Sequence, residues 1–175
     1  MENNPIQTML DEHEIISSAE SIIKKLDGMW ENDIDTYRTT IHTLVTFFTE
    51  YADGYHHRKE EEVLFPAIKN HPEFILEEMV DELEQHHEEF RDYAREILEH
   101  LESDEDEKAY KILDDYLEDL LDHIGAENDE LFITAETLLS EEELETIYFK
   151  FKDIDMELGE EQKTELEGTL ESLPI

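Results

Sequence analysis

The sequence predicts an all-α protein: an up-down-up-down four-helix bundle with a short additional C-terminal helix. Long stretches place apolar residues three and four positions apart, which is the spacing of an amphipathic helix. Only five glycines and four prolines interrupt the 175 residues, and no stretch alternates as a strand would. Four long helices joined by short connections are expected to pack antiparallel around one core.

The first three helices are bounded by turn signals. The first is expected over residues 5–30, because Pro5 suits the first turn of a helix. The second is expected over residues 34–70 and ends before Pro72, because the residue that precedes a proline avoids the helical conformation. The third is expected over residues 72–101, where apolar residues again recur at helical spacing.

Two serines mark the remaining helix starts. Ser103 precedes a run of acidic residues, which predicts an N-cap followed by an acidic first turn. The fourth helix is therefore expected from there to about residue 139. Ser140 and Glu143 have the spacing of a capping box, so a shorter fifth helix is expected to run to about residue 158.

The chain is expected to form one bundle domain over residues 1–158, followed by an acidic C-terminal tail over residues 159–175. The tail carries few apolar residues, so we expect it to be frayed or loosely packed. The whole chain is very acidic, with 51 acidic against 13 basic residues and a formal net charge of −38. This charge is compatible with a host that has a salt-rich interior and with a protein that is merely very soluble.

The composition also excludes several classes of function. An acidic surface repels phosphate groups and anionic lipids, so we expect neither a nucleic acid nor a membrane as partner. The chain has no cysteine, which excludes disulfides, thiolate metal sites, iron–sulfur clusters and cysteine nucleophiles. No apolar run approaches 18 residues, and no signal peptide is evident. We therefore expect a cytoplasmic protein.

Two segments repeat the same pattern of chemistry. Each reads His-x-x-x-Glu and then Leu-Phe four residues later, once from His56 and once from His123. Residues at positions i and i+4 lie on one face of a helix, so each segment offers a nitrogen and an oxygen ligand to the same metal ion. The faces concerned are otherwise apolar, where an unpaired polar side chain costs several kcal/mol.

Four helices contribute such inward-facing polar residues. At about 1.5 Å of rise per residue, their distances from the turns place all of them in one layer, within about 10 Å. Ligands that converge from four helices are what a metal site in a bundle core requires. The predicted metal ligands are His13, His56, Glu60, His87, His123 and Glu127.

The helical register leaves alternatives in two helices. His57 and Glu61 also have the i, i+4 spacing, but their face is more polar, which favours His56 and Glu60. His57 could still reach the metal from the rim. In the third helix His87 has a more continuous apolar face than His86, and is favoured for that reason. His57, Glu61 and His86 remain the less certain candidates.

The donor types indicate the metal. Nitrogen and carboxylate ligands without sulfur suit iron, and manganese and zinc are also compatible. Six ligands are more than a tetrahedral zinc ion uses. Two carboxylates that can bridge, together with four histidines, suit two iron ions per chain with an open position for a small molecule.

These motifs resemble those of the hemerythrin-like HHE cation-binding domains. The resemblance covers about residues 5–158, and its four motifs lie at residues 11–13, 53–66, 85–88 and 123–132. It implies a bundle around a bridged di-iron centre, in which Glu60 and Glu127 are the bridging carboxylates. Members of the family bind oxygen, or sense or handle iron, oxygen or nitric oxide.

The resemblance implies a metal- and ligand-binding protein rather than an enzyme, with a small diatomic partner such as oxygen or nitric oxide. The alternative is a di-iron enzyme that reduces peroxide or nitric oxide. One departure matters, because invertebrate hemerythrins carry His-x-x-x-His on the third helix. Here Arg91 follows His87, so the site has fewer histidines than the oxygen carriers unless His57 or His86 joins it. Sensing or redox handling therefore ranks with oxygen transport.

Overall fold

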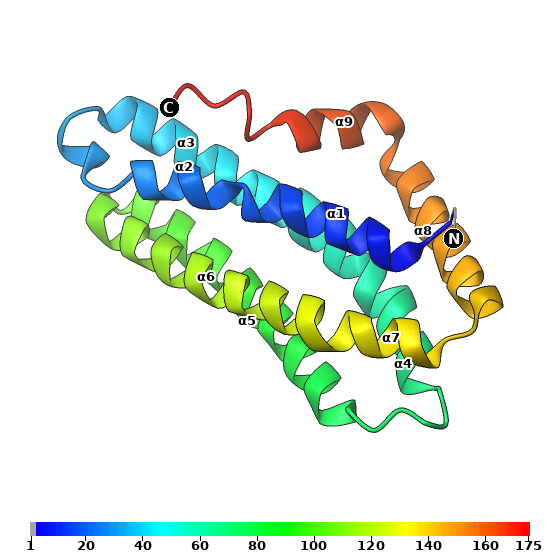
Figure 1. Ribbon diagram of the computed structural model, residues 1–175. Coiled ribbons are helices and arrows are strands. Elements are labelled where there is room, and N and C mark those ends of the chain that lie inside the picture. Colours follow the sequence, from blue (N-terminus) through cyan, green and yellow to red (C-terminus); the bar gives the residue numbers. More distant parts are fainter. Residues whose placement is uncertain (1–2) are drawn as a thin grey trace.

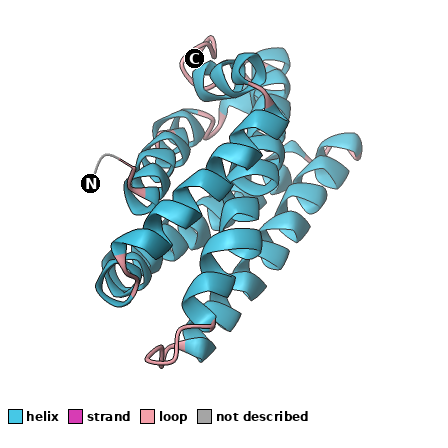
Figure 2. Cartoon of the chain, turned by 90° about the vertical axis from the view of Figure 1, so that its right-hand side faces the viewer, coloured by secondary structure: helices cyan, strands magenta, loops and turns pink. Residues whose placement is uncertain are grey.

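Residues 3–175 are described in a computed structural model, and all the regular structure among them is helical. Successive long helices traverse the bundle in opposite directions and lie side by side (Figure 1). Short loops join them at the two ends (Figure 2). Among the described residues, no helix combines the length and the apolar character needed to cross a membrane. The predicted all-α bundle is thus confirmed.

The first arm of the bundle is interrupted, whereas one helix over residues 5–30 was expected. Its elements are α1 (Pro5–Ser17), α2 (Ala19–Lys25) and the 3-10 turn η1 (Met29–Glu31). The hydroxyl of Ser18 donates to the carbonyl oxygen of Ile15 at 2.6 Å, and a serine that bonds the preceding turn bends a helix. Gly28 then adopts a φ of 71°, a left-handed conformation that suits glycine.

The second arm is helical over the expected span but is not α-helical throughout. It comprises α3 (Ile34–Phe47), the π-helical segments η2 (Phe48–His57) and η3 (Glu60–Leu64), and α4 (Phe65–Lys69). The side chain of Asp33 caps its start by accepting from the backbone N–H of Thr36 at 3.1 Å. The sequence pattern did not predict the π-helical turns.

The third and fourth arms start later than expected. They comprise α5 (Glu77–Glu102), α6 (Asp106–Ala126), the π-helical η4 (Glu127–Leu131) and α7 (Phe132–Leu138). The helix predicted from residue 72 begins at Glu77, because Phe74 is buried in the core and keeps the segment before it in a turn. Ser103 ends α5 instead of capping α6, whose N-cap is Glu105.

The C-terminal segment is helical and packed, which corrects the expectation of a frayed tail. The capping box of Ser140 and Glu143 is confirmed, with both of its hydrogen bonds present at the start of α8 (Glu141–Leu158). The chain then turns at Gly159 into α9 (Glu160–Gly168), which runs back along the bundle (Figure 1). Leu166 and Leu170 are buried in the core, and this apolar contact holds the tail in place.

The apolar core consists of two clusters with a polar layer between them. One cluster contains Ile16, Phe90 and Leu120, and the other contains Met9, Leu83 and Leu131. In the first, third and fourth arms, one apolar residue from each cluster lies on either side of a buried histidine. The expected layer of polar residues therefore lies at one height in the bundle, enclosed by apolar side chains above and below.

Candidate metal centre

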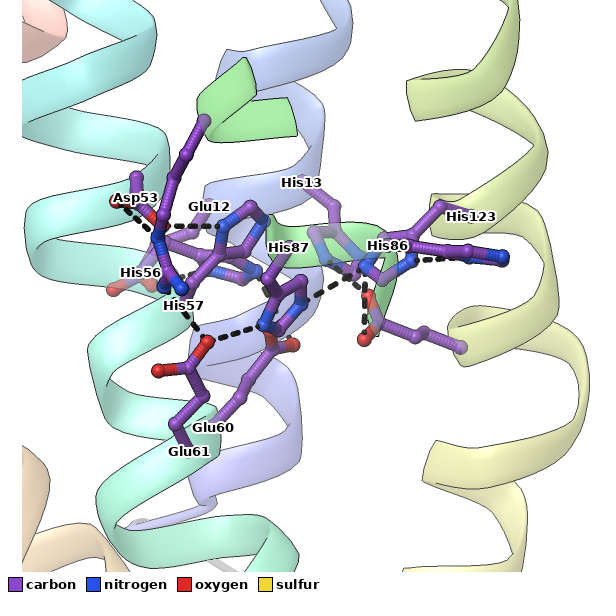
Figure 3. Close-up of polar contacts among 12 residues, drawn as sticks. Glu12, His13, Asp53, His56, His57, Glu60, Glu61, His86, His87 and His123 are labelled. Carbon is purple, nitrogen blue, oxygen red and sulfur yellow. Dashed lines mark hydrogen bonds and ion pairs between the residues drawn. The ribbon is translucent and has the colours of Figure 1, made fainter. Parts of the chain in front are cut away.

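Seven ionisable side chains form the polar layer, and all of them are buried. Histidine rings from four arms of the bundle converge there (Figure 3). We call the following residues the histidine–glutamate layer: His13, His56, His57, Glu60, His87, His123 and Glu127. It contains the six predicted ligands and one of the less certain candidates, His57.

The π-helical turns explain why neighbouring histidines share the layer. In a π-helix each backbone hydrogen bond spans five residues, so the turn is wider and successive side chains are separated by a smaller angle. His56 and His57 end η2, and both are nearly inaccessible to solvent, at 1% and 2% exposure. A regular α-helix would turn one of them away from the core. Both rings therefore lie inside, whereas of the two neighbouring glutamates only Glu60 is buried and Glu61 is partly exposed.

Each glutamate of the layer faces two different groups of histidines. Glu60 places Oε1 3.3 Å from His56 Nε2 and Oε2 3.4 Å from His87 Nε2. The two carboxylate oxygens thus point to opposite sides of the layer. A carboxylate in this position can bind one cation through each oxygen.

Glu127 repeats the arrangement from α6 and η4. Its Oε1 lies 3.2 Å from His123 Nε2, and its Oε2 lies 3.2 Å from His13 Nε2. The layer therefore divides into two donor sets that share the two glutamates. The first donor set is His57, His87 and His123, and the second donor set is His13 and His56.

The spacing of these atoms is that of ligands around a metal ion. Donors that each lie about 2.1 Å from one ion are about 3 Å from their neighbours around it. His87 Nε2 and His123 Nε2 approach to 3.2 Å, and the carboxylate contacts are similar. Within each of two groups of four residues, the potential ligand atoms all lie within 4.8 Å of one another.

The hydrogen bonding of the layer also fits a cation. Among the described residues, seven buried side-chain atoms lack a hydrogen-bond partner, and six of them belong to this layer. They are His13 Nε2, His56 Nε2 and both carboxylate oxygens of Glu60 and of Glu127. Burying such atoms unpaired is costly, and a bound metal ion would satisfy them together.

The opposite nitrogen of each ring is occupied by an outer partner. The Nδ1 atoms of the histidines lie within 2.7–3.3 Å of a polar side-chain atom outside the layer. Such a partner fixes the tautomer and the orientation of a metal-binding histidine. For His13, His56, His57, His87 and His123 the partners are Asn128, Glu12, Asp53, Glu61 and His86 in turn.

Glu61 and His86, the other two less certain candidates, therefore lie outside the layer. Three of the outer partners were not predicted: Glu12, Asp53 and Asn128. Each lies one or four residues from a histidine or glutamate of the layer. Such spacings are too common in an acidic chain to identify an outer partner.

Arg91 occupies the position where a second histidine was missing from the third arm. Its guanidinium donates to Asp53 at 2.9 Å and to Glu61 at 2.8 Å. These two carboxylates are the outer partners of His57 and His87, whose rings stack at 3.8 Å. The fifth histidine of the layer, His57, thus comes from the second arm. Arg91 fixes the two carboxylates that orient His57 and His87.

Burial and the neighbouring side chains set the charges of the layer. Burial raises the pKa of Glu127, but His123 and His13 outweigh burial and hold it well below its usual value. Burial and the neighbouring His87 hold the pKa of His57 well below its usual value, which favours the neutral ring. Burial lowers the pKa of His56, but Glu60 and Glu12 together have the larger effect and raise this pKa to about 10. A metal ion that binds there displaces a proton.

Substitution of His57 and of His86 should distinguish a metal ligand from an outer partner. We expect His57→Ala to lower the number of metal ions bound at saturation, because the first donor set loses a nitrogen. We expect His86→Ala to weaken binding by about 10–100-fold while the number of ions bound at saturation is unchanged. Metal analysis after titration and gel filtration measures both quantities. Equal losses would contradict the placement of His57 inside the layer.

Comparison with known proteins adds one finding. A family model described as "Hemerythrin HHE cation binding domain" matches residues 4–135. The matched segment includes every residue of the histidine–glutamate layer and ends before α8. No curated protein and no solved structure matches the chain.

Proposed function

The chain belongs to the hemerythrin HHE cation-binding domain family, and on this basis we propose that its histidine–glutamate layer holds two iron ions and binds a small diatomic ligand. Oxygen and nitric oxide are the ligands that this chemistry favours. Iron bound there would supply an electron source and a Lewis acid for the diatomic molecule.

One observation carries the proposal of two ions. Glu60 and Glu127 each direct one oxygen to the first donor set and the other oxygen to the second. A single ion placed in one donor set would leave the oxygen of each carboxylate that faces the other set buried without a partner. Two ions, one in each donor set, use all four oxygens.

The donor types support iron. Five imidazoles and two carboxylates without sulfur suit iron, manganese or zinc. Structural zinc sites use four ligands, which the seven residues of the layer exceed. The inner ring of neutral nitrogen and shared carboxylate donors is the arrangement expected for a pair of iron ions in a helical bundle.

The two donor sets are unequal, which supports binding of a small ligand. The first set supplies three imidazoles and the second only two, so the second ion would have one imidazole donor fewer. Phe132 stacks on His13 with the ring centroids 5.3 Å apart. An apolar ring beside this set limits access of water.

Metal analysis combined with rapid mixing tests the proposal. We expect purified protein to hold close to two iron ions per chain, and the reduced protein to form a reversible adduct when mixed with oxygen in a stopped-flow spectrometer. Irreversible oxidation with turnover of peroxide or nitric oxide would favour the enzymatic alternative. Absence of iron near two per chain after growth and loading with iron(II) would contradict the proposal.

A further inference from the structure

Lys59 is an unusual residue of the second arm because its side chain is completely buried, at 0% exposure. Its Nζ donates to Glu12 Oε1 at 2.6 Å and lies 2.8 Å from Asp155 Oδ1. The same ammonium group lies over the ring of Tyr55, 3.8 Å from the centroid. A buried ammonium group requires paired charges, and here two carboxylates from different helices supply them.

These carboxylates connect the C-terminal helix to the histidine–glutamate layer. Asp155 belongs to α8, and Glu12 belongs to α1. The second oxygen of Glu12, Oε2, accepts from Nδ1 of His56 at 2.8 Å. A continuous chain of contacts therefore runs from Asp155 through Lys59 and Glu12 to His56. Figure 3 shows its inner end, where Glu12 lies beside His56.

We infer that α8 is a positioning element for the metal centre, in which Asp155 holds Lys59, Lys59 holds Glu12, and Glu12 orients His56. The inference rests on the proposed function only in taking His56 as a metal ligand. The helix α8 lies beyond residues 4–135, the segment that matches the family. The chain thus adds to the family's bundle a helix that acts on one ligand.

The geometry of Glu12 explains how a residue on α8 can affect the histidine. Both oxygens of this carboxylate are engaged, one by Lys59 and one by His56, so its plane cannot rotate. Asp155 in turn accepts from Tyr55 at 2.6 Å and from Lys152 at 2.8 Å. Its position is therefore well defined. Loss of the Asp155 charge would leave Lys59 with one carboxylate and free it to pull Glu12 away from His56.

The effect should be confined to the second donor set. The outer partners of His57, His87 and His123 are Asp53, Glu61 and His86, and none of these contacts Lys59. Among the histidines of the layer, His56 alone has an outer partner that contacts Lys59. A disturbance of Asp155 should therefore loosen one of the two ions and leave the other unchanged.

The first test needs no metal. In the metal-free protein, the proton on His56 Nδ1 is held by Glu12 and should give a downfield resonance that exchanges slowly with water. We expect Asp155→Asn to increase its exchange rate about tenfold or more, as expected when a buried charge-assisted hydrogen bond is weakened by about 1.4 kcal/mol or more. Asp153→Asn makes the same change at an exposed position of α8 and should have no effect. Asp155→Glu, which keeps the carboxylate, should retain slow exchange.

The second test measures release of iron. Protein loaded with iron(II) is mixed with a chelator, and the two ions are followed separately by the phases of release. We expect Asp155→Asn to accelerate one phase by about 10–100-fold, the effect of losing an outer partner, and to leave the other unchanged. Thermal unfolding of each variant checks that α8 stays folded, and Asp155→Glu should restore slow release.

The outcomes separate the two proposals. If the wild-type protein binds no iron, the proposed function fails, while proton exchange at His56 still tests the coupling. If Asp155→Asn and Asp153→Asn behave alike in both measurements, the inference about α8 is overturned. Equal acceleration of both phases would also overturn it, because the contacts reach the second donor set alone.

Discussion

Glu60→Gln is expected to abolish binding of both of the metal ions that we propose for the layer, because it alters a residue shared by the two donor sets. The glutamine keeps the size of the side chain but replaces one carboxylate oxygen with an NH2 group, which cannot bind a cation. The remaining oxygen carries no full negative charge. We expect the affinity of each ion to fall by more than about 100-fold, since the loss of an outer partner alone costs about 10–100-fold.

The matched control is Glu61→Gln, one residue along the same π-helical segment. Glu61 accepts from Nδ1 of His87 at 2.8 Å and from Arg91, so its loss should weaken binding without changing the number of ions bound at saturation. Metal analysis after equilibrium dialysis against iron(II) gives both affinity and stoichiometry. Retention of two ions by Glu60→Gln, or an equal loss in Glu61→Gln, would show that the wrong carboxylate has been placed at the centre.

Lys59→Met is expected to lower the free energy of unfolding by about 3–5 kcal/mol, which is the usual cost of removing one partner from a buried ion pair. Methionine has a similar length and fills the apolar space beside Tyr55. It cannot donate to Glu12 or to Asp155, so both carboxylates lose a buried cationic partner, although Glu12 keeps its contact with His56. Burial raises the pKa of Glu12, but His56 and Lys59 outweigh it and hold it below its usual value. The carboxylate is thus charged when the lysine is present.

Urea unfolding followed by circular dichroism measures this effect in metal-free protein. Lys111→Met is the control, because Lys111 pairs with Asp115 at the surface and its loss should change stability little. The double variant Lys59→Met with Glu12→Gln should recover part of the lost stability, because position 12 then carries no buried carboxylate that has lost a partner. If Lys59→Met unfolds no more easily than Lys111→Met, the buried pair does not contribute to stability.

Much of the fold followed from periodicity and capping residues. Apolar residues at helical spacing indicated the four arms, and Ser140 with Glu143 marked the start of α8. The break after Ser17 and the late start of α5 at Glu77 were missed. Both depend on contacts that spacing does not report: a serine hydroxyl bonded to the preceding turn, and the burial of Phe74 against residues distant in sequence.

The candidate site was predicted in part for the same reason. The His-x-x-x-Glu spacing places His56 with Glu60 and His123 with Glu127 on one helix face, whatever the rest of the chain does. His57 was only a less certain candidate, expected to reach the metal from the rim, because a regular α-helix puts neighbouring residues on different faces. The π-helical turns of η2 and η3 change that angle.

The sequence by itself determined that this protein is a helical bundle with a layer of histidine and glutamate side chains across its core, because helical spacing and the distance from each turn are local properties. Only the tertiary structure decided three further features. They are the two donor sets that share Glu60 and Glu127, the outer partners of the rings, and the packing of α8 and α9 that brings Asp155 to Lys59. Each includes contacts between residues far apart in the chain, and these contacts exist only once the helices have packed and excluded water from the charges between them.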